Sequence, residues 1–457
     1  MESQSINTRL NKFSWALAAI LFLPLLFTKG MFFDGLTYAS IARNLELGLG
    51  TWFEPHYTLG LHNTFYEHPP LSFIMHSVLY RLFGDHFWVD RLYPYIFYGI
   101  SVLIIRRLWA LHVPAAHRAW IPQLMFTLTP TVIWVHQHNM LEAPLGALTL
   151  ITVWLMVEGS MRGKHWWSAI AAITLIAAAH IKGPVGLFPL ITLPLIAVLY
   201  PEYRKNAFVG LTVFSITSGF VISLLVFYLP GYENNIMQYL DQQVLATLSG
   251  ARGQSGSVLG SLWTLTKQLW VPVALFIVFR IKGGKEFQFN KHVLFFFTIA
   301  LSATVPFLFL DKQHHYYFAP SMVYWMFAFA VLYQQHPWPW SFKRKKLTAR
   351  MAYINMLLWV VAVVLALVYS KGVAQDRWLY KDLDAIAEVT GENVQIYAPD
   401  HMTDWRAQAY AQRYFRMSFM NNPDGCDYSI LESDHKTVQG LVELRGDWIL
   451  TKKAGTH

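Results

Sequence analysis

Ionisable side chains stand at the ends of long apolar stretches of this sequence, where a charge is costly and usually functional. They are Asp34, Glu67, His68, Arg91, His136, His138, Glu142, Lys182, Lys312, His314 and His315. Carboxylates beside cations suit an anionic substrate whose acceptor must lose a proton, because one carboxylate can take that proton and the cations can stabilise a departing phosphate. The mixture predicts transfer of a group from a phosphate-linked donor, with the apolar stretches around a lipid tail.

The composition places these residues in a membrane protein. Hydrophobic residues make up 54% of the 457 and charged residues only 14%, well below the roughly 25% of a soluble domain. This excludes a disordered chain, a coiled coil and an ordinary cytosolic enzyme. The net charge of +9 does not indicate a nucleic-acid partner, because the basic residues fall in short clusters between apolar stretches. The single cysteine, Cys426, excludes a disulfide framework and a cysteine-based zinc site.

The elements that must position the site are membrane-spanning helices, each needing about 20 mostly apolar residues. The sequence predicts eleven of them, over residues 13–29, 88–111, 119–136, 141–158, 166–181, 184–200, 206–229, 266–281, 292–310, 316–333 and 351–370. The first follows Arg9 and Lys12, and no small-residue cleavage site follows it, so we expect a retained anchor and not a signal peptide. The expected fold class is an all-α polytopic membrane protein.

Basic residues are spread unevenly over the loops between these spans. With the N-terminus inside, the inner loops hold half of the chain's 36 lysines and arginines and few acids, which is the pattern that sets orientation. An odd number of spans then places the C-terminal tail outside. The ionisable residues named above all fall on the outer side, so we expect one site there, open to the outer half of the membrane.

Two outer stretches between spans border this site. Residues 30–87 contain two short apolar helical patterns, which start at Asp34 and at Pro70 and predict helices lying in the membrane interface. Residues 230–265 are polar and include Gly250, Gly253 and Gly256, which predicts a mobile outer loop.

The tail, residues 371–457, alternates helical and strand-like segments after a membrane domain of residues 1–370. This alternation predicts a small α/β domain outside the membrane. Its helices are expected at 379–389 and 404–414, and its strands at 393–398, 416–419, 428–431 and 448–451.

Six short motifs occur in order along the chain. They are Asp34 with Tyr38-Ala-Ser-Ile-Ala-Arg43, Glu67-His68-Pro69-Pro70-Leu71, Phe83-Gly84 with Arg91-Leu92, Asn139-Met-Leu-Glu142-Ala-Pro-Leu145, Lys182-Gly183-Pro184, and Lys312-Gln-His-His315-Tyr316 with Pro320. Together they resemble the outer-face motifs of GT-C membrane glycosyltransferases, in particular the bacterial lipid A aminoarabinose transferase and the protein O-mannosyltransferases. The resemblance extends over about residues 13–335.

The resemblance implies the GT-C fold, with about eleven transmembrane helices, interfacial helices and an enzyme at the outer face of the bacterial inner (plasma) membrane. The implied donor is a polyprenyl-phosphate sugar such as an undecaprenyl phosphate derivative, the acceptor is a lipid, a glycan or a protein, and the anomeric carbon is inverted. Catalysis is assigned to Asp34, Glu67 and Glu142. Contacts to the donor phosphate or lipid are assigned to His68, Arg91, Lys182, Lys312, His314, His315 and Tyr316.

The sequence predicts no definite cofactor and leaves metal dependence open. A divalent cation, Mg²⁺ or Mn²⁺, held by Asp34, Glu142 and His138 stays open as an alternative. The chain departs from the family in having Gly35 after the first acid, where many relatives have a second acid, which speaks against a pair of carboxylates there. It also has His68 where the aminoarabinose transferase has lysine, which speaks against an aminoarabinose donor without establishing mannose.

Each site residue also has an ordinary structural interpretation. Asp34 and Glu142 can cap the helices that they begin, Arg91 can reach the lipid headgroups, and Tyr316 can belong to the aromatic belt at the membrane surface.

Two other functions compete with the glycosyltransferase. A transporter or flippase of lipid-linked sugars would need helices broken at the bilayer midplane and repeat symmetry, and the polar groups here gather at one face without a visible repeat. A membrane-anchored binding protein that works through its tail would not need so many charged residues outside the tail.

Overall fold

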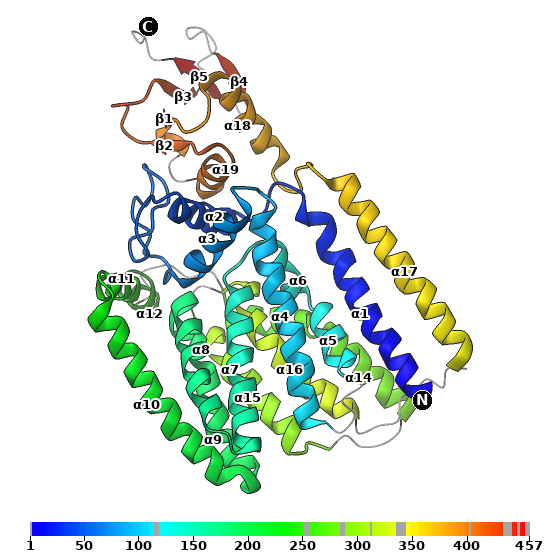
Figure 1. The fold of residues 1–457 in the computed structure, drawn as a ribbon. Coiled ribbons are helices and arrows are strands. Elements are labelled where there is room, and N and C mark those ends of the chain that lie inside the picture. Colours follow the sequence, from blue (N-terminus) through cyan, green and yellow to red (C-terminus); the bar gives the residue numbers. More distant parts are fainter. Residues whose placement is uncertain are drawn as a thin grey trace.

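Apolar helices make up most of the chain and run roughly side by side, with a small sheet at one end of the bundle (Figure 1). The computed structural model describes residues 2–113, 118–249, 256–283, 288–310, 313–334, 344–401, 404–432, 441–445 and 448–452. The elements of the membrane part are α1 (Glu2–Leu26), α2 (Phe33–Glu46), α3 (Leu71–Phe83), α4 (Val89–His112), α5 (Trp120–Thr127), α6 (Pro130–Gln137), α7 (Glu142–Arg162), α8 (Trp166–Lys182), η2 (Gly183–Ile191), α9 (Thr192–Leu199), η3 (Pro201–Tyr203), α10 (Arg204–Tyr228), α11 (Tyr232–Tyr239), η4 (Leu240–Leu245), α12 (Ala246–Leu248), α13 (Val258–Gln268), α14 (Trp270–Gly283), α15 (Lys291–Leu308), η5 (His315–Phe318), α16 (Ala319–Gln334) and α17 (Arg344–Tyr369).

Among the described residues, seven helices are long and apolar enough to cross a membrane, or eight if α13 and α14, which meet at a bend of 62°, form one span. One of the seven apolar segments, Trp166–Leu199, turns back on itself. Its chain reverses after Lys182, so that Gly186 lies against the backbone of Ala178. This segment therefore supplies both of the spans that were expected at 166–181 and 184–200 (Figure 1).

Two expected spans, 119–136 and 316–333, are shorter helices than predicted. The first is divided into α5 and α6, because Pro130 begins a new helix and disfavours helical geometry in the residue before it. The second corresponds to α16, which has only 16 residues and follows the short 3₁₀ turn η5.

The helix α2 is buried inside the molecule. Every residue from Gly35 to Asn44 is buried. The reason is that α2 is covered on two sides: Met31 and Leu36 belong to the hydrophobic core of the tail, whereas Ile41 packs with α3 and α7. Polar residues on α2 therefore lie in the interior of the molecule.

The polar stretch 230–265, predicted as a mobile loop, is largely helical within the described residues, since it forms α11, the π-helix η4, α12 and the start of α13. Tyr232, Asn235 and Tyr239 recur at helical spacing and are buried. The Tyr232 hydroxyl also lies 2.8 Å from His180 Nε2. Of the glycines that suggested a loop, Gly250 and Gly253 fall outside the described residues.

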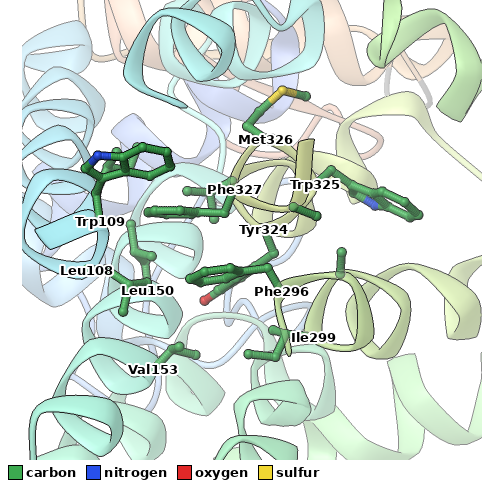
Figure 2. Close-up of a cluster of buried hydrophobic side chains, with 14 of the residues drawn as sticks. Leu108, Trp109, Leu150, Val153, Phe296, Ile299, Tyr324, Trp325, Met326 and Phe327 are labelled. Carbon is green, nitrogen blue, oxygen red and sulfur yellow. The ribbon is translucent and has the colours of Figure 1, made fainter. Parts of the chain in front are cut away.

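The largest hydrophobic core joins α4, α7, α15 and α16 (Figure 2). Phe296 stacks on Phe327 with 4.6 Å between ring centroids, and Trp109 contacts the same ring at 6.3 Å. Leu150 and Tyr324 fill the space beside them. This packing fixes α7 relative to α16, and the outer ends of both helices reach the candidate site.

The tail forms the expected α/β domain from α18 (Arg377–Thr390), η6 (Pro399–His401), α19 (Trp405–Phe415) and five strands. The strand order is β2-β1-β3-β5-β4, with β1 parallel to β2 and β3 and the other pairs antiparallel. The strands are β1 (Gln395–Tyr397), β2 (Ser418–Met420), β3 (Tyr428–Glu432), β4 (Val442–Leu444) and β5 (Trp448–Lys452). The short edge strand β4 was not expected from the sequence.

A buried ion pair fastens the tail to the outer end of the bundle. Arg413 on α19 donates to both oxygens of Asp90 at 2.8 and 2.9 Å and to Asp85 at 2.9 Å. Tyr80 donates to the same Asp90 carboxylate at 2.5 Å. The pair is bidentate and shielded from solvent, with Arg413 only 4% and Asp90 0% exposed, so it fixes geometry strongly.

Removing the buried guanidinium of Arg413 should therefore destabilise the protein far more than removing the exposed guanidinium of its neighbour Arg416. We expect Arg413→Met to cost about 3–5 kcal/mol, because Asp90 would stay buried without its partner. The matched control is Arg416→Met, whose side chain is 40% exposed and reaches Asp85 from outside, and it should cost less than about 1 kcal/mol. Chemical unfolding of the purified protein in detergent measures both, and equal costs would contradict the role given to Arg413.

The same contact predicts how stability depends on pH. Burial opposes ionisation of Asp85, but Arg413 and Arg416 outweigh it and lower the pKa of this carboxyl below its usual 3.8. A depressed native pKa contributes stability above the unfolded value and loses it as the pH falls through the native value. Unfolding titrations from pH 6 downward should show this loss, and it should be absent in Asp85→Asn.

Candidate functional site

The candidate base Asp34 lies in the first turn of α2 and does not cap it. The residue at the cap position is Phe32, and no side chain accepts a capping hydrogen bond there. The start of α2 is held from the α6–α7 connection instead: the Phe32 N–H donates to His138 Nδ1 at 3.0 Å, and Asn139 donates to the Gly35 carbonyl at 2.8 Å. The carboxylate is thus presented from a helix start that packs directly on this connection.

The residue after Asp34 must be glycine in this arrangement. A Cβ atom at Gly35 would lie 1.9 Å from the carbonyl oxygen of His138, which no side chain can tolerate. This contact explains why the chain lacks the second acid that many GT-C relatives have, and it excludes a pair of adjacent carboxylates on the present backbone.

The tail forms hydrogen bonds with the chain just before Asp34. Lys29 Nζ donates to the Tyr380 hydroxyl at 2.5 Å, and the Gly30 N–H donates to the Tyr414 hydroxyl at 2.6 Å. The backbone of Lys29 also forms an isolated parallel bridge with Val373. The position of Asp34 therefore depends on the tail as well as on the bundle.

The second acid, Glu142, forms a buried ion pair with Lys182. Glu142 begins α7 and Lys182 ends α8, and their side chains are 1% and 12% exposed. The Lys182 ammonium also lies over the rings of Tyr317, at 4.8 Å, and Tyr316, at 5.6 Å, where cation–π attraction is favourable. Lys182 is thus a fixed positive charge in surroundings that are largely aromatic.

The turn after Lys182 requires glycine as well. Gly183 has a φ of +66°, and a Cβ there would lie 2.1 Å from the hydroxyl oxygen of Tyr239. That hydroxyl donates to the Lys182 carbonyl at 3.3 Å, so α11 closes over the end of α8. The break at Gly183-Pro184, which ends α8, therefore directs Lys182 into the site.

Tyr38 connects Asp34 and Glu142 to His68, in the segment between α2 and α3. Its hydroxyl lies 3.1 Å from His68 Nε2. The pKa of Tyr38 is raised well above its usual value, first by burial and then by the negative charges of Asp34 and Glu142, with smaller effects from Tyr316 and Glu67. We define the polar cluster by these seven residues: Asp34, Tyr38, Glu67, His68, Glu142, Lys182 and Tyr316.

A cavity of about 430 Å³ opens beside the polar cluster. Its lining is mixed, and most of the apolar side chains come from η2 and α15. The polar residues are Glu67, His68, Lys182, Tyr239, Gln243, Thr247, Ser302 and Tyr317, and the apolar ones are Pro184, Val185, Phe188, Val244, Ala303, Pro306, Phe307 and Leu310. The arrangement suits a ligand with an anionic head and a hydrocarbon body.

Arg91, assigned to the phosphate from the sequence, has other partners. Its guanidinium donates to the backbone carbonyls of Thr28, Gly30 at 2.6 Å and Gln137 at 3.1 Å, and the side chain is buried. It thus satisfies carbonyls at the end of α1, where a helix leaves such groups unpaired. Neither the expected phosphate contact nor the headgroup contact agrees with these partners.

The histidines and the lysine before Tyr316 have mixed outcomes. His314 is exposed and stacks on Tyr316, with 5.1 Å between ring centroids. His315 packs against Trp134 at 4.7 Å and edge-on against Tyr316 at 5.4 Å. Lys312 lies outside the described residues. Both histidines thus lie at the edge of the polar cluster, where each contacts Tyr316.

The suggested metal ligands do not form a metal site in the described part of the chain. No group of three His, Cys, Asp or Glu side chains there could hold a metal ion. His138 uses Nδ1 for Phe32, and Glu142 uses one oxygen for Lys182.

Several residues of the site were missed from the sequence. Tyr38 lies one helical turn after Asp34, so its i, i+4 spacing was a usable signal. Tyr239 and Gln243 lie four residues apart in the stretch that we took for a loop, and the helical spacing of its buried residues was the signal there. For Tyr317 we find no signal beyond its place beside Tyr316.

Because Gly35 lies so close to the His138 carbonyl, adding a single methyl group at this position should destabilise the protein. Gly35→Ala should displace the start of α2 and cost about 1–3 kcal/mol, the usual range for overpacking. The control is Gly99→Ala in α4, where a Cβ would meet no heavy atom within 4 Å and helix propensity should improve. Thermal unfolding of both purified variants decides between them. A neutral Gly35→Ala would show that the α2 contact is not tight.

Comparison with known proteins supports the fold. No family model and no curated protein sequence matches the chain. Among solved structures, ArnT from Cupriavidus metallidurans in the apo state matches with a TM-score of 0.63 and 16% identity, covering 91% of each chain. The same protein bound to undecaprenyl phosphate matches with a TM-score of 0.54 and 18% identity, over 88% of this chain and 75% of that one.

A third match is the oligosaccharyltransferase from Archaeoglobus fulgidus in the apo form, with a TM-score of 0.51 and 12% identity over 93% of this chain and 69% of that one. These identities are low, so the matches bear on the fold. The apolar helices, the outer helices α2 and α3 and the α/β tail agree with it. The chain has the GT-C fold of polytopic membrane glycosyltransferases.

Proposed function

We propose that the protein is a glycosyltransferase that moves a sugar from a polyprenyl phosphate to a lipid, glycan or protein acceptor at the outer face of the bacterial inner membrane. The observation that carries the proposal is a largely buried ammonium, Lys182, in the wall of a cavity that apolar side chains from η2 and α15 also line. A phosphate attached to a hydrocarbon chain matches both parts of this cavity.

The donor would place its phosphate at Lys182 and His68 and its prenyl chain along α15 and η2. In surroundings of low dielectric constant, a fixed cation interacts with a phosphate far more strongly than in water. Undecaprenyl phosphate bound to ArnT, which has the same fold, supports this class of donor. The cavity volume of about 430 Å³ falls within the usual range of small-molecule sites, roughly 300–1,000 Å³.

The transfer step assigns the proton to Asp34. The acceptor oxygen forms a bond to the anomeric carbon while the bond from that carbon to the phosphate oxygen breaks. The electron pair leaves with the polyprenyl phosphate, whose charge Lys182 stabilises, and the acceptor proton passes to the Asp34 carboxylate. Attack opposite the leaving phosphate inverts the anomeric carbon.

The remaining residues have supporting roles in this proposal. Glu142 holds Lys182 in place through the buried pair, and Glu67 orients the acceptor at the mouth of the cavity. Tyr316, with His314 stacked on it, forms a wall beside the ammonium. Lys312 and His315 stay as candidates for donor contact from the sequence.

The proposed orientation has the N-terminus in the cytoplasm and the tail in the periplasm. In Figure 1 the N-terminus and the tail lie at opposite ends of the bundle, and α2, which carries Asp34 and Tyr38, lies beside the tail. The uneven spread of basic residues over the loops of the sequence supports this orientation by the positive-inside rule.

The assignment of Asp34 predicts that Asp34→Asn abolishes transfer but not binding of the donor. Transfer should fall about a hundredfold or more, the usual contribution of a general base. In a deletion strain, mass spectrometry of envelope lipids and proteins would identify the acceptor that goes unmodified. The wild-type gene should restore its modification and Asp34→Asn should not, while the purified variant still gains thermal stability from undecaprenyl phosphate.

The control for this experiment is Asp384→Asn, an exposed acid on α18, which should restore the modification fully. Full restoration by Asp34→Asn would overturn the proposed base.

The assignment of Lys182 predicts a selective loss of donor binding. Lys182→Ala should raise the apparent KM for the lipid-linked donor about tenfold to a hundredfold, as expected for a lost charge-assisted hydrogen bond, and should change the KM for the acceptor far less. Lys381→Ala, an exposed lysine on α18, is the control. Equal changes for both substrates would show that Lys182 is structural.

A further inference from the structure

Two buried polar atoms that the mechanism above does not use lie close to the ion pair. Glu142 Oε2 and His136 Nε2 are both shielded from solvent, and neither has a hydrogen-bond partner among the described residues. The other oxygen of Glu142 is bonded to Lys182. Buried acceptors of this kind are costly to leave unpaired.

Both residues line one small internal cavity. Its volume is about 10 Å³, which is about the minimum that holds a single water molecule. The cavity lies between α4, α5, α6, α7 and α16, and its remaining lining is Ser101, Phe126, Val132, Val135, Ala143, Gly146, Leu150, Ala319, Pro320 and Val323. Among the lining residues, only Ser101, His136 and Glu142 have polar side chains.

The hydrogen bonding of His136 determines what the cavity can bind. Nδ1 lies 2.7 Å from the Val132 carbonyl, and a carbonyl can only accept, so Nδ1 carries the proton. The ring packs among Phe22, Tyr98 and Phe126, with ring centroids 5.5–6.5 Å away, where a second proton and its charge would be unfavourable. Nε2 is therefore an acceptor, like the carboxylate oxygen of Glu142.

We propose that this cavity binds one water molecule, which donates one hydrogen bond to His136 Nε2 and the other to Glu142 Oε2. Two acceptors cannot bond to each other, whereas the two O–H groups of one water molecule can satisfy both. His136 is then a positioning residue: through the water it fixes the carboxylate of Glu142, and through Glu142 it fixes Lys182. The catalytic consequence rests on the proposed function, whereas the water site itself does not.

The water also completes the hydrogen bonding of the Glu142 carboxylate, whose other oxygen is bonded to Lys182. The groups that face Glu142 from the packed elements are Lys182 from α8, Tyr38 from α2, Tyr316 from η5 and His136 from α6. The helices α4, α5 and α16 contribute no titratable residue to the cavity.

The first test is direct observation of the site in the whole protein. A high-resolution cryo-electron-microscopy or crystal map of the purified protein in nanodiscs should show density for one atom between His136 Nε2 and Glu142 Oε2. A cavity without density would overturn the proposal, and so would an anomalous signal from a metal ion at this position.

The second test compares two substitutions of His136. His136→Phe keeps an aromatic ring in its aromatic surroundings but removes the acceptor, whereas His136→Gln can return an acceptor oxygen near the position of Nε2. Infrared difference spectra of the purified protein between H₂¹⁶O and H₂¹⁸O report the O–H stretch of a buried water. Its band should be present in the wild type, absent in His136→Phe and present again in His136→Gln.

A water band that persists in His136→Phe would contradict the proposal, as would its loss from both variants, which would indicate a packing defect. These readouts need no substrate, so their outcome is separate from that of the transfer assays. If the proposed function also holds, His136→Phe should raise the donor KM about tenfold, and it should have no further effect in a Glu142→Gln background, as expected of residues that act through one another.

Discussion

The site depends on the close contact between two backbone segments, the start of α2 and the connection between α6 and α7. Gly35 meets the His138 carbonyl with no room for a side chain, and Asn139 donates to the Gly35 carbonyl. Because Asp34 precedes the first segment's glycine and Glu142 ends the second segment, this contact sets the relative positions of the two acids. Native interiors are packed densely enough that such a contact leaves little freedom.

The contact has a counterpart on the side of the tail. Met31 and Leu36, which flank Asp34, are part of the hydrophobic core of the tail, and Arg413 joins α19 to Asp90 at the start of α4. The α/β domain is therefore a structural support of the site as well as a cover over it. A tail that unfolded would release the chain before Asp34, so we infer that the membrane helices alone cannot hold this carboxylate in place.

The sequence predicted the fold class and most elements of the tail, because apolar stretches of about 20 residues and short alternating segments are local signals. It also predicted that Asp34, Glu142 and Lys182 belong together, since charge beside apolar stretches is costly. It could not predict that Arg91 would bind backbone carbonyls instead of a phosphate, because those carbonyls come from the ends of other helices. The burial of α2 could not be predicted either, since the residues that cover it belong to a domain more than 300 residues away along the sequence.

The geometry also separates the directions from which the two proposed substrates would approach. The apolar walls of the cavity come from η2 and α15, so a prenyl chain would extend away from the tail along the bundle. Asp34 stands on α2, which the tail covers, so an acceptor would reach it from the outer side. In the proposed transfer the phosphate is held at Lys182 between these two directions, so the acceptor oxygen and the leaving phosphate would lie on opposite faces of the sugar, as an inverting displacement requires.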